Sequence, residues 1–208
     1  MLYKQDIANL ALGHIGATQR LMDFDNENST AAKIIRTHFR TSLDTMLESH
    51  EWGFATQFSA LTLAVAQPNY SYRFAYELPA DCQVLRMIAY DGRFPKVKQY
   101  EKEKFKFREV FNGAGSRLIY TDVELAHGEY TTRINDDFAF PTHFGRGLAH
   151  LLALDIAPSL ITNNFPKVKE ALMATSSNEL SKAIAFDLGR ETLQEDSPSP
   201  FISCRRGE

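Results

Sequence analysis

Leu47 to Ala64 has the sequence LESHEWGFATQFSALTLA, and along this stretch the pattern of the chain changes. Before Trp52 the apolar residues recur at intervals of three and four, as they do on one face of a helix. After Gly53 come short runs of aromatic and β-branched residues separated by Pro, Asn and Gly, which are typical of strands joined by turns. We therefore expect a helical part to end and a β-rich part to begin here.

Two helices are predicted before this change. The first covers about Lys4 to Ile15, and Gly16 stands where a C-terminal cap belongs. The second follows a polar connector, with Asn28 or Ser29 as its N-cap. Its apolar stripe is the clearest helical pattern in the chain and consists of Ala31, Ile34, Ile35, Phe39, Leu43, Met46, Leu47 and His50.

The β-rich part is predicted to form a small antiparallel domain. Turn signals recur along it, as at Asp91-Gly92 and in the run from Asn112 to Gly115. The predicted strands lie near Phe54 to Ala64, Tyr70 to Glu77, Val84 to Tyr90, Arg93 to Lys98, Arg117 to Thr121 and Tyr130 to Ile134.

Two more helices and a tail complete the chain. Pro141 suits the first position of the third helix, which Pro158 is expected to end. Pro166 starts the fourth helix, whose polar middle, Thr175 to Asn178, favours a bend or a break. After Gly189 the chain has two Ser-Pro steps and few apolar residues, so we expect an extended tail.

The predicted fold class is thus α+β. It is a helical bundle of about four helices with an inserted small antiparallel β domain and an extended C-terminal tail. We assign residues 1–53 to the N-terminal helices, 54–140 to the β insertion, 141–189 to the C-terminal helices and 190–208 to the tail. The length suits one domain with a sizeable insertion.

The composition predicts a folded protein without a strong overall charge. Of 208 residues, 44% are hydrophobic and 24% are charged, which is ordinary for a globular chain. The net charge of -3 argues against tight, salt-sensitive DNA binding. The chain has no signal-peptide pattern and no apolar run of membrane-spanning length, so we expect a soluble, cytoplasmic protein. Cys82 and Cys204 are expected to be reduced thiols.

No set of residues has the pattern of an active site. The sequence contains neither a GxSxG elbow nor HExxH, and the run Gly113 to Ser116 lacks the Lys of a phosphate-binding loop. Asp136 and Asp137 are adjacent and would point to opposite faces of an extended segment, so they suit a helix N-terminus better than acid-base catalysis. We therefore expect no enzymatic activity and no cofactor.

A metal site is one alternative for two of the histidines. His143 and His150 could share a helix face two turns apart, with Asp155 one turn further along. Histidines at a helix surface or an interface are the simpler interpretation, and no metal is expected.

Two patterns in the β-rich part suggest contacts with other molecules. Lys96 to Glu109 interleaves basic residues with Phe105 and Phe107, as in nucleic-acid binding, but its glutamates favour a solvated loop or a subunit contact. The second pattern is aromatic and consists of Trp52, Phe54, Phe58, Tyr70, Tyr72, Phe74 and Tyr76. The last four would share one face of a regular strand. Either that face packs on a neighbouring subunit or the rings form the core.

Small residues on the third helix suggest a close approach of another backbone. They are Gly145, Gly147, Ala149 and Ala153. As inter-subunit contacts we predict Tyr70, Tyr72, Phe74, Tyr76, Gly145 and Ala149.

Four segments carry a resemblance to a known family. They are DIANLALGHIGA (Asp6 to Ala17), LESHEWGFATQFSALTLA (Leu47 to Ala64), YELPADCQVLRM (Tyr76 to Met87) and GRGLAHLLALDIAPSLITN (Gly145 to Asn163). In this order they resemble the tail tubular protein A and head-to-tail adaptor (connector) family of short-tailed bacteriophages. Each segment is a loose pattern, so the resemblance lies in their order; it covers neither Lys96 to Glu109 nor the tail.

The resemblance implies a structural role in a virion. It implies a twelvefold ring below the portal, with a helical bundle and a β domain in each subunit, that joins the capsid to the tail and continues the DNA channel. The implied partners are further copies of the chain, the portal protein, the next tail protein (nozzle or tube) and double-stranded DNA in transit, with no membrane. The ring would lie in the neck of the virion after assembly in the host cytoplasm.

The tail is expected to bind within this assembly. We predict that Pro198, Phe201, Ile202, Arg205 and Arg206 become ordered against the portal or a neighbouring subunit, since about 18 extended residues reach roughly 60 Å. A passive, unstructured end is the alternative. Two other functions stay open: a different tail-completion or baseplate protein, and a small hydrolase that uses a His and an Asp brought together by folding.

Overall fold

The computed structural model describes residues 1–65, 71–90, 105–111, 116–161 and 165–191. The helices in these ranges are α1 (Lys4–His14), α2 (Thr30–Glu48), α3 (Thr142–Leu160) and α4 (Phe165–Glu191), with a short 3-10 helix, η1, at Gly53–Ala55. The strands are β1 (Thr56–Ala60), β2 (Thr62–Leu63), β3 (Phe74–Glu77), β4 (Cys82–Tyr90), β5 (Phe107–Phe111), β6 (Arg117–Thr121) and β7 (Ala126–Thr132). The predicted α+β fold with about four helices is confirmed.

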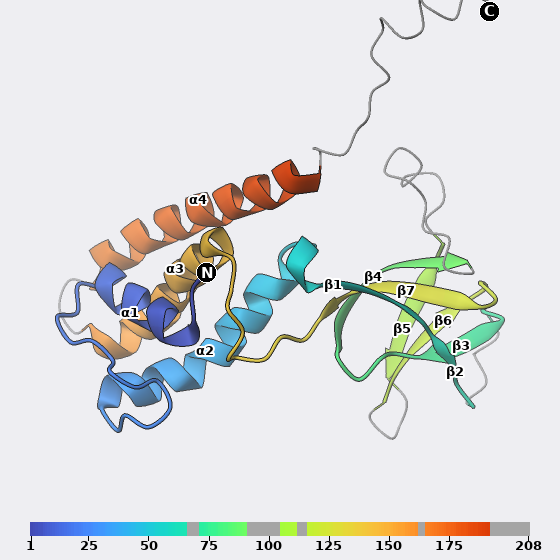
Figure 1. Ribbon diagram of the computed structural model, residues 1–208, viewed down its shortest axis with the longest axis horizontal. Coiled ribbons are helices and arrows are strands. Elements are labelled where there is room, and N and C mark those ends of the chain that lie inside the picture. Colours follow the sequence, from blue (N-terminus) through green and yellow to red (C-terminus); the bar gives the residue numbers. More distant parts are fainter. Residues whose placement is uncertain (66–70, 91–104, 112–115, 162–164, 192–208) are drawn as a thin grey trace, which may run out of the picture.

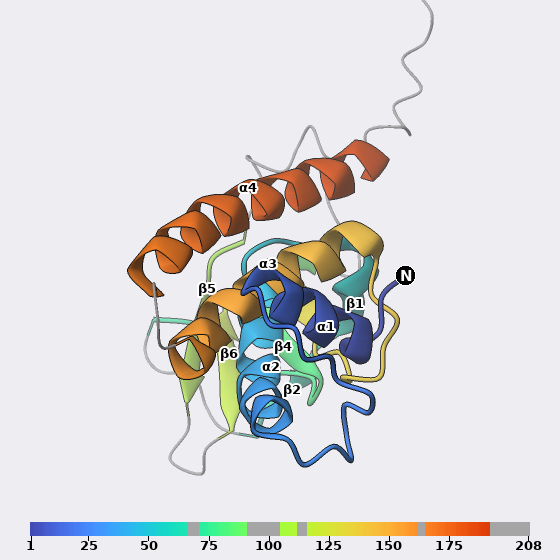
Figure 2. The same cartoon turned by 90° about the vertical axis from the view of Figure 1, so that its left-hand side faces the viewer.

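The helices lie at one end of an elongated molecule and the strands at the other (Figure 1). All the described strands come between α2 and α3 in the chain, so the β part is an insertion in the bundle. The bundle core is formed by apolar side chains such as Phe39 and Leu43 of α2 and Leu148 of α3. α4 lies across α3 as an outer layer (Figure 2) and fully buries few side chains, among them Leu172 and Ala183.

Both predicted caps of the first two helices are present. The Ser29 hydroxyl accepts a hydrogen bond from the Ala32 N–H at 3.2 Å, which satisfies a free donor at the start of α2. Gly16 follows α1 with a φ of +74°, a left-handed conformation that glycine adopts without strain.

The last two helices run further than predicted. Pro158 lies inside α3, which continues to Leu160, so the prediction that it ends the helix is wrong by a short margin. Of the bend or break predicted at Thr175 to Asn178, the break is wrong, because α4 is one helix throughout. The Thr175 hydroxyl donates to the Ala171 carbonyl at 2.9 Å, so the polar side chain is satisfied within the helix.

The strands form two antiparallel sheets. The three-stranded sheet has the order β1-β7-β4, and the four-stranded sheet has the order β2-β3-β6-β5. A shared core joins them, with Leu85, Ile88 and Tyr130 from the first sheet and Tyr76 and Ile119 from the second.

Several strand predictions need correction. The single strand expected over Phe54 to Ala64 is divided between η1, β1 and β2, because the chain passes from one sheet to the other near Leu61. β7 begins at Ala126, four residues before the prediction, and includes Gly128. A Cβ there would lie 2.9 Å from Leu85 Cδ1, so the glycine permits close packing inside the β part. The strand predicted at Arg93 to Lys98 lies outside the described residues.

The sequence also missed β5. The segment Lys96 to Glu109 was predicted to be a solvated loop or a subunit contact, but its end from Phe107 onward forms a strand paired with β6. Arg108 and Glu109 interrupt the apolar alternation there, and the charge of Glu109 is met by an ion pair with Arg117 of β6. Residues 96–104 lie outside the described part.

Candidate functional site

The junction between the bundle and the β part is the most elaborate polar site in the described residues, and Arg86 is at its centre. Arg86 lies on β4, and its Nη2 donates to the carbonyls of Leu47, Glu48 and His50 at 2.9 to 3.1 Å. Its Nε donates to the Thr131 hydroxyl at 3.0 Å. The Leu47 and Glu48 carbonyls end α2 and that of His50 lies just beyond it, where free acceptors and the helix dipole favour a cation. One side chain of the sheet therefore caps a helix of the bundle.

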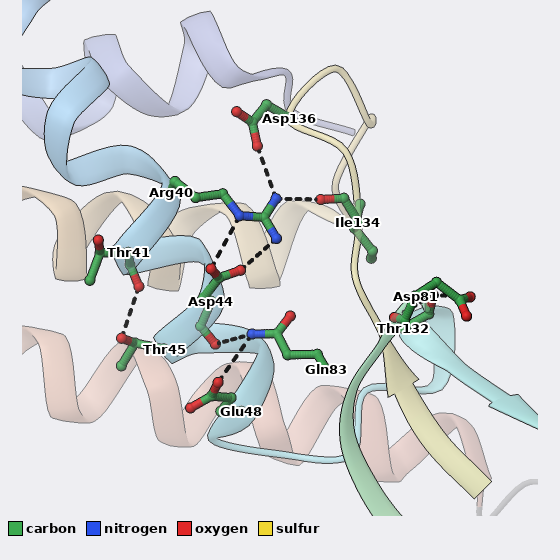
Figure 3. Close-up of polar contacts among 10 residues, drawn as sticks. All are labelled: Arg40, Thr41, Asp44, Thr45, Glu48, Asp81, Gln83, Thr132, Ile134 and Asp136. Atoms are coloured by element: carbon green, nitrogen blue, oxygen red, sulfur yellow. Dashed lines mark hydrogen bonds and ion pairs between the residues drawn. The ribbon is translucent and has the colours of Figure 1, made fainter. Parts of the chain in front are cut away.

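A second group of side chains binds the chain where it returns from the β part (Figure 3). Arg40 of α2 donates to the Ile134 carbonyl at 2.8 Å and forms an ion pair with Asp136 at 3.2 Å. Asp44, one turn further along α2, holds the same guanidinium at 2.6 Å. Gln83 of β4 donates to the Asp44 carbonyl at 3.2 Å. β4 and the returning segment are thus both tied to α2.

Aromatic rings pack at the same boundary between the bundle and the β part. The Trp52 indole donates to the Met46 carbonyl at 2.8 Å and packs edge-on against Phe144 of α3, with ring centroids 4.9 Å apart. Phe54 stacks on Phe138 with centroids 5.9 Å apart, so the two segments that cross the boundary contact each other. Polar and apolar contacts together fix the β part relative to the bundle.

A seam of histidines lies where α4 and α1 meet α3. His14 and His150 stack with ring centroids 3.7 Å apart, beside Glu179 of α4. Burial lowers the pKa of both imidazoles, and the neighbouring His150 lowers that of His14 further. His143 stacks on Phe186 of α4 at 3.9 Å. His150 is buried between the helices, whereas His14 and His143 are exposed, which agrees with the interpretation of histidines at a helix surface.

The predicted aromatic face is only partly formed. Phe74 and Tyr76 pack on the core between the sheets, but Tyr72 packs on the opposite face, against Tyr120 with centroids 6.4 Å apart. The expectation of one shared face is therefore wrong, because β3 begins only at Phe74. Tyr76 is buried and its hydroxyl donates to the Val123 carbonyl at 2.9 Å. Tyr70 lies outside the described residues.

The small residues of α3 pack against other parts of the same chain. A Cβ at Gly145 would lie 2.9 Å from Leu2 Cδ1, so this glycine admits the N-terminal segment. Ala149 is fully buried in the bundle core. The close approach predicted at these two positions is thus intramolecular, and the two offer no surface to a neighbouring subunit. A subunit contact by the half-buried Tyr72 and Phe74 stays a prediction.

The described residues do not assemble a recognisable catalytic set. Folding brings His50 within 3.5 Å of Asp187, but that imidazole packs on Trp52 rather than on a hydroxyl or a thiol. Burial raises the pKa of the Cys82 thiol to about 11, so it is protonated at neutral pH, although it borders a cleft of about 310 Å³.

The predicted alternative of a metal at His143 is not supported. In the described ranges, no group of three His, Cys, Asp or Glu side chains is arranged to hold an ion. His143 and His150 contact different partners, and Asp155 accepts a hydrogen bond from the Ser42 hydroxyl at 2.6 Å.

No protein-family model matches the sequence, and no curated protein matches it. None of the described helices combines the length and apolarity needed to span a membrane.

The predicted contacts of Pro198, Phe201, Ile202, Arg205 and Arg206 lie outside the described residues.

Proposed function

We propose that this protein is a structural head-to-tail adaptor of a bacteriophage neck. In this proposal it forms a ring below the portal, joins the capsid to the tail and continues the DNA channel. The four ordered sequence segments suggest the role, and the fold supports it, since a helical bundle with a β insertion is what the resemblance implies.

The observation that carries the proposal is the fixed junction. Copies in a closed ring must repeat the same contacts at the same angle, so a subunit with two parts needs them held in one orientation. Arg86 and Gln83 reach from β4 to the end of α2, and Arg40 reaches from α2 to the returning chain. In such a subunit, a partner bound at the bundle and a partner bound at the β part have a fixed orientation relative to each other.

The charges also suit a channel through which DNA moves. A protein that holds DNA tightly presents free Lys and Arg side chains to the phosphates. Here the net charge is -3, and several cations are already paired, such as Lys4 with Asp25 and Asp137. We propose that DNA passes through without specific binding, and that the partners are the portal and the next tail protein.

The test is the mass of the full chain with and without the portal protein encoded in the same genome. We expect a closed ring, near twelve copies, on the portal, seen by native mass spectrometry and electron microscopy. A chain that stays monomeric and never binds that portal would contradict the proposal.

The tail has its own test within this proposal. α4 extends to Glu191, so a chain ending there removes the tail without shortening the helix. We expect this truncation, and Phe201→Ala with Ile202→Ala, to weaken portal binding at least tenfold, while Thr192→Ala leaves it unchanged. If the truncated chain binds the portal as tightly as the full chain does, the tail is not part of the contact.

A further inference from the structure

Where α4 lies across α3 (Figure 2), the outer surface carries more positive than negative side chains. Arg146 of α3 and Lys182 of α4 have side chains that are each 58% exposed. Both pair with the carboxylate of Glu179, at 3.8 and 2.7 Å, so two cations share one anion. Arg190, near the end of α4, adds a third positive charge.

Aromatic stacking orients this last arginine. His143 of α3 stacks on the Phe186 ring with centroids 3.9 Å apart, and the Arg190 guanidinium lies 4.9 Å from the centroid of the same ring. All three side chains are exposed. A guanidinium that already lies over a ring has less freedom to lose when its planar fork binds an anion. The basic face of the bundle is defined by Arg146, Lys182, Arg190, His143 and Phe186.

The acidic side chains nearby leave the basic face positive. The hydrogen bond from Lys182, together with the charges of Lys182 and Arg146, lowers the pKa of Glu179. Asp187 lies on the same stretch of α4, but its side chain is only 14% exposed and accepts a hydrogen bond from the Gly53 N–H at 3.0 Å. The local charge is therefore positive, although the net charge of the chain is -3.

The composition of the basic face favours a protein partner over DNA. Proteins that hold DNA through its phosphates make about six to ten such contacts, more than three cations provide. The Phe186 ring is 43% exposed and offers apolar area that phosphates do not use. Arginine and aromatic side chains are enriched in interfaces between proteins. The anions that fit this face are thus the carboxylates of another protein.

We propose that the basic face binds an acidic face of a partner protein, whose carboxylates meet Arg190 at one end and the Arg146–Lys182 pair at the other. Lys182 and Arg190 are eight residues apart on one helix, which corresponds to about 12 Å along its axis. A partner helix with Asp or Glu repeated along one face has carboxylates at the same spacing. The inference goes beyond the proposed function and does not depend on it.

The test is a titration of the full chain with two helical peptides of equal composition, followed by the amide signals in nuclear magnetic resonance spectra. In the first peptide three Glu residues follow one face, one turn apart; in the second the same residues are spread around the helix. We expect the first peptide to shift the signals at the start of α3 and the end of α4, and to bind about tenfold more tightly than the second. Added salt should weaken this binding.

A triple variant locates the binding on the basic face. Arg146→Gln, Lys182→Gln and Arg190→Gln together should weaken binding of the first peptide about tenfold, since several exposed ion pairs are lost at once. The control removes the same charge from exposed positions elsewhere, with Arg20→Gln, Lys167→Gln and Lys169→Gln, and should bind like the wild type.

Three results would overturn the inference. The first is equal binding of the two peptides, or no shift at the basic face. The second is an equal loss in the triple variant and in its control, which would mean that only the net charge matters. The third is a short DNA duplex that shifts the same signals at lower concentration than the first peptide, which would assign the face to DNA.

Discussion

Replacing Arg86 by Met should weaken the attachment of the β part to the bundle. Met has a similar length and fills the space of the aliphatic stem, but it has no donors. The carbonyls of Leu47, Glu48 and His50 then lose their shared partner, as does the Thr131 hydroxyl. The loss falls at the end of α2, where a positive charge is also favourable.

The size of the effect follows from which carbonyls water can reach. The bonds to Leu47 and His50 are part-buried, and the bond to Glu48 is exposed, so water can replace the last one. A hydrogen bond to a charged group contributes about 1.5–3 kcal/mol, and bonds that share one donor do not add fully. We expect Arg86→Met to lower the free energy of unfolding by about 3 kcal/mol, on the order of a hundredfold in the folding equilibrium. Arg86→Lys should recover less than half, because an ammonium cannot reproduce the planar fork.

Urea unfolding followed by two probes measures this loss. Trp52 fluorescence reports the bundle side of the junction, and far-ultraviolet circular dichroism reports both parts. In Arg86→Met we expect both probes to report the same, earlier transition, whose midpoint and slope give the loss in the free energy of unfolding. Arg133→Met, an exposed arginine of the returning segment, should stay within about 0.5 kcal/mol of the wild type. An Arg86→Met midpoint equal to the wild type would show that Arg86 does not hold the junction.

Three further predictions concern the bundle and the buried thiol. The pKa values of His14 and His150 in the folded chain lie below the ordinary 6.5, so as the pH falls the unfolded chain binds protons before the folded chain does. The free energy of unfolding should therefore be highest above pH 6.5 and decrease as the pH drops below that value. Melting curves from pH 8 to 5 should show this fall, which His150→Gln reduces and His38→Gln leaves as it is. Gly145→Val should lower the free energy of unfolding by about 1–3 kcal/mol because a Cβ would lie 2.9 Å from Leu2. Gly13→Ala, with no atom within 4 Å, should raise it by up to about 1 kcal/mol in the same urea titration. In a Cys204→Ser chain, the Cys82 thiol should react with a thiol reagent at neutral pH much more slowly in the folded chain than after unfolding, because the side chain is buried and its pKa is raised to about 11. Equal labelling rates of the folded and the unfolded chain would contradict this.

Local signals predicted the helices well and the strands unevenly. α2 combines an N-cap at Ser29 with a full apolar stripe, and both act within a few residues, so the sequence was sufficient. β6 was also predicted with its observed limits. β5 was missed because the charge of Glu109 is compensated by Arg117, and only the folded sheet brings that partner beside it. Tyr72 was placed on the wrong face because the start of β3 decides the alternation, and the sequence alone does not fix that start.

The junction could not be found from the sequence for a related reason. Arg86 and its acceptor at His50 are 36 residues apart, and the acceptors are backbone carbonyls, which any residue provides. Composition and spacing detect side-chain chemistry, such as an acid beside a base. They do not show that the carbonyl groups at the end of a helix need a hydrogen-bond donor from elsewhere in the chain. The small residues of α3 led to the prediction of a contact with another subunit. Gly145 does admit a close neighbour, but that neighbour is Leu2 of the same chain.

If the chain forms a ring, the junction matters for the contact with the portal. Copies in a closed ring repeat the same contacts at the same angle. If Arg86 and Arg40 did not hold each bundle to its β part, the bundles would face the portal at variable angles, and the ring would bind the portal weakly. Arg86→Met should therefore reduce portal binding, whereas Arg133→Met should leave it unchanged. Equal portal binding by Arg86→Met and the wild type would contradict this role of the junction.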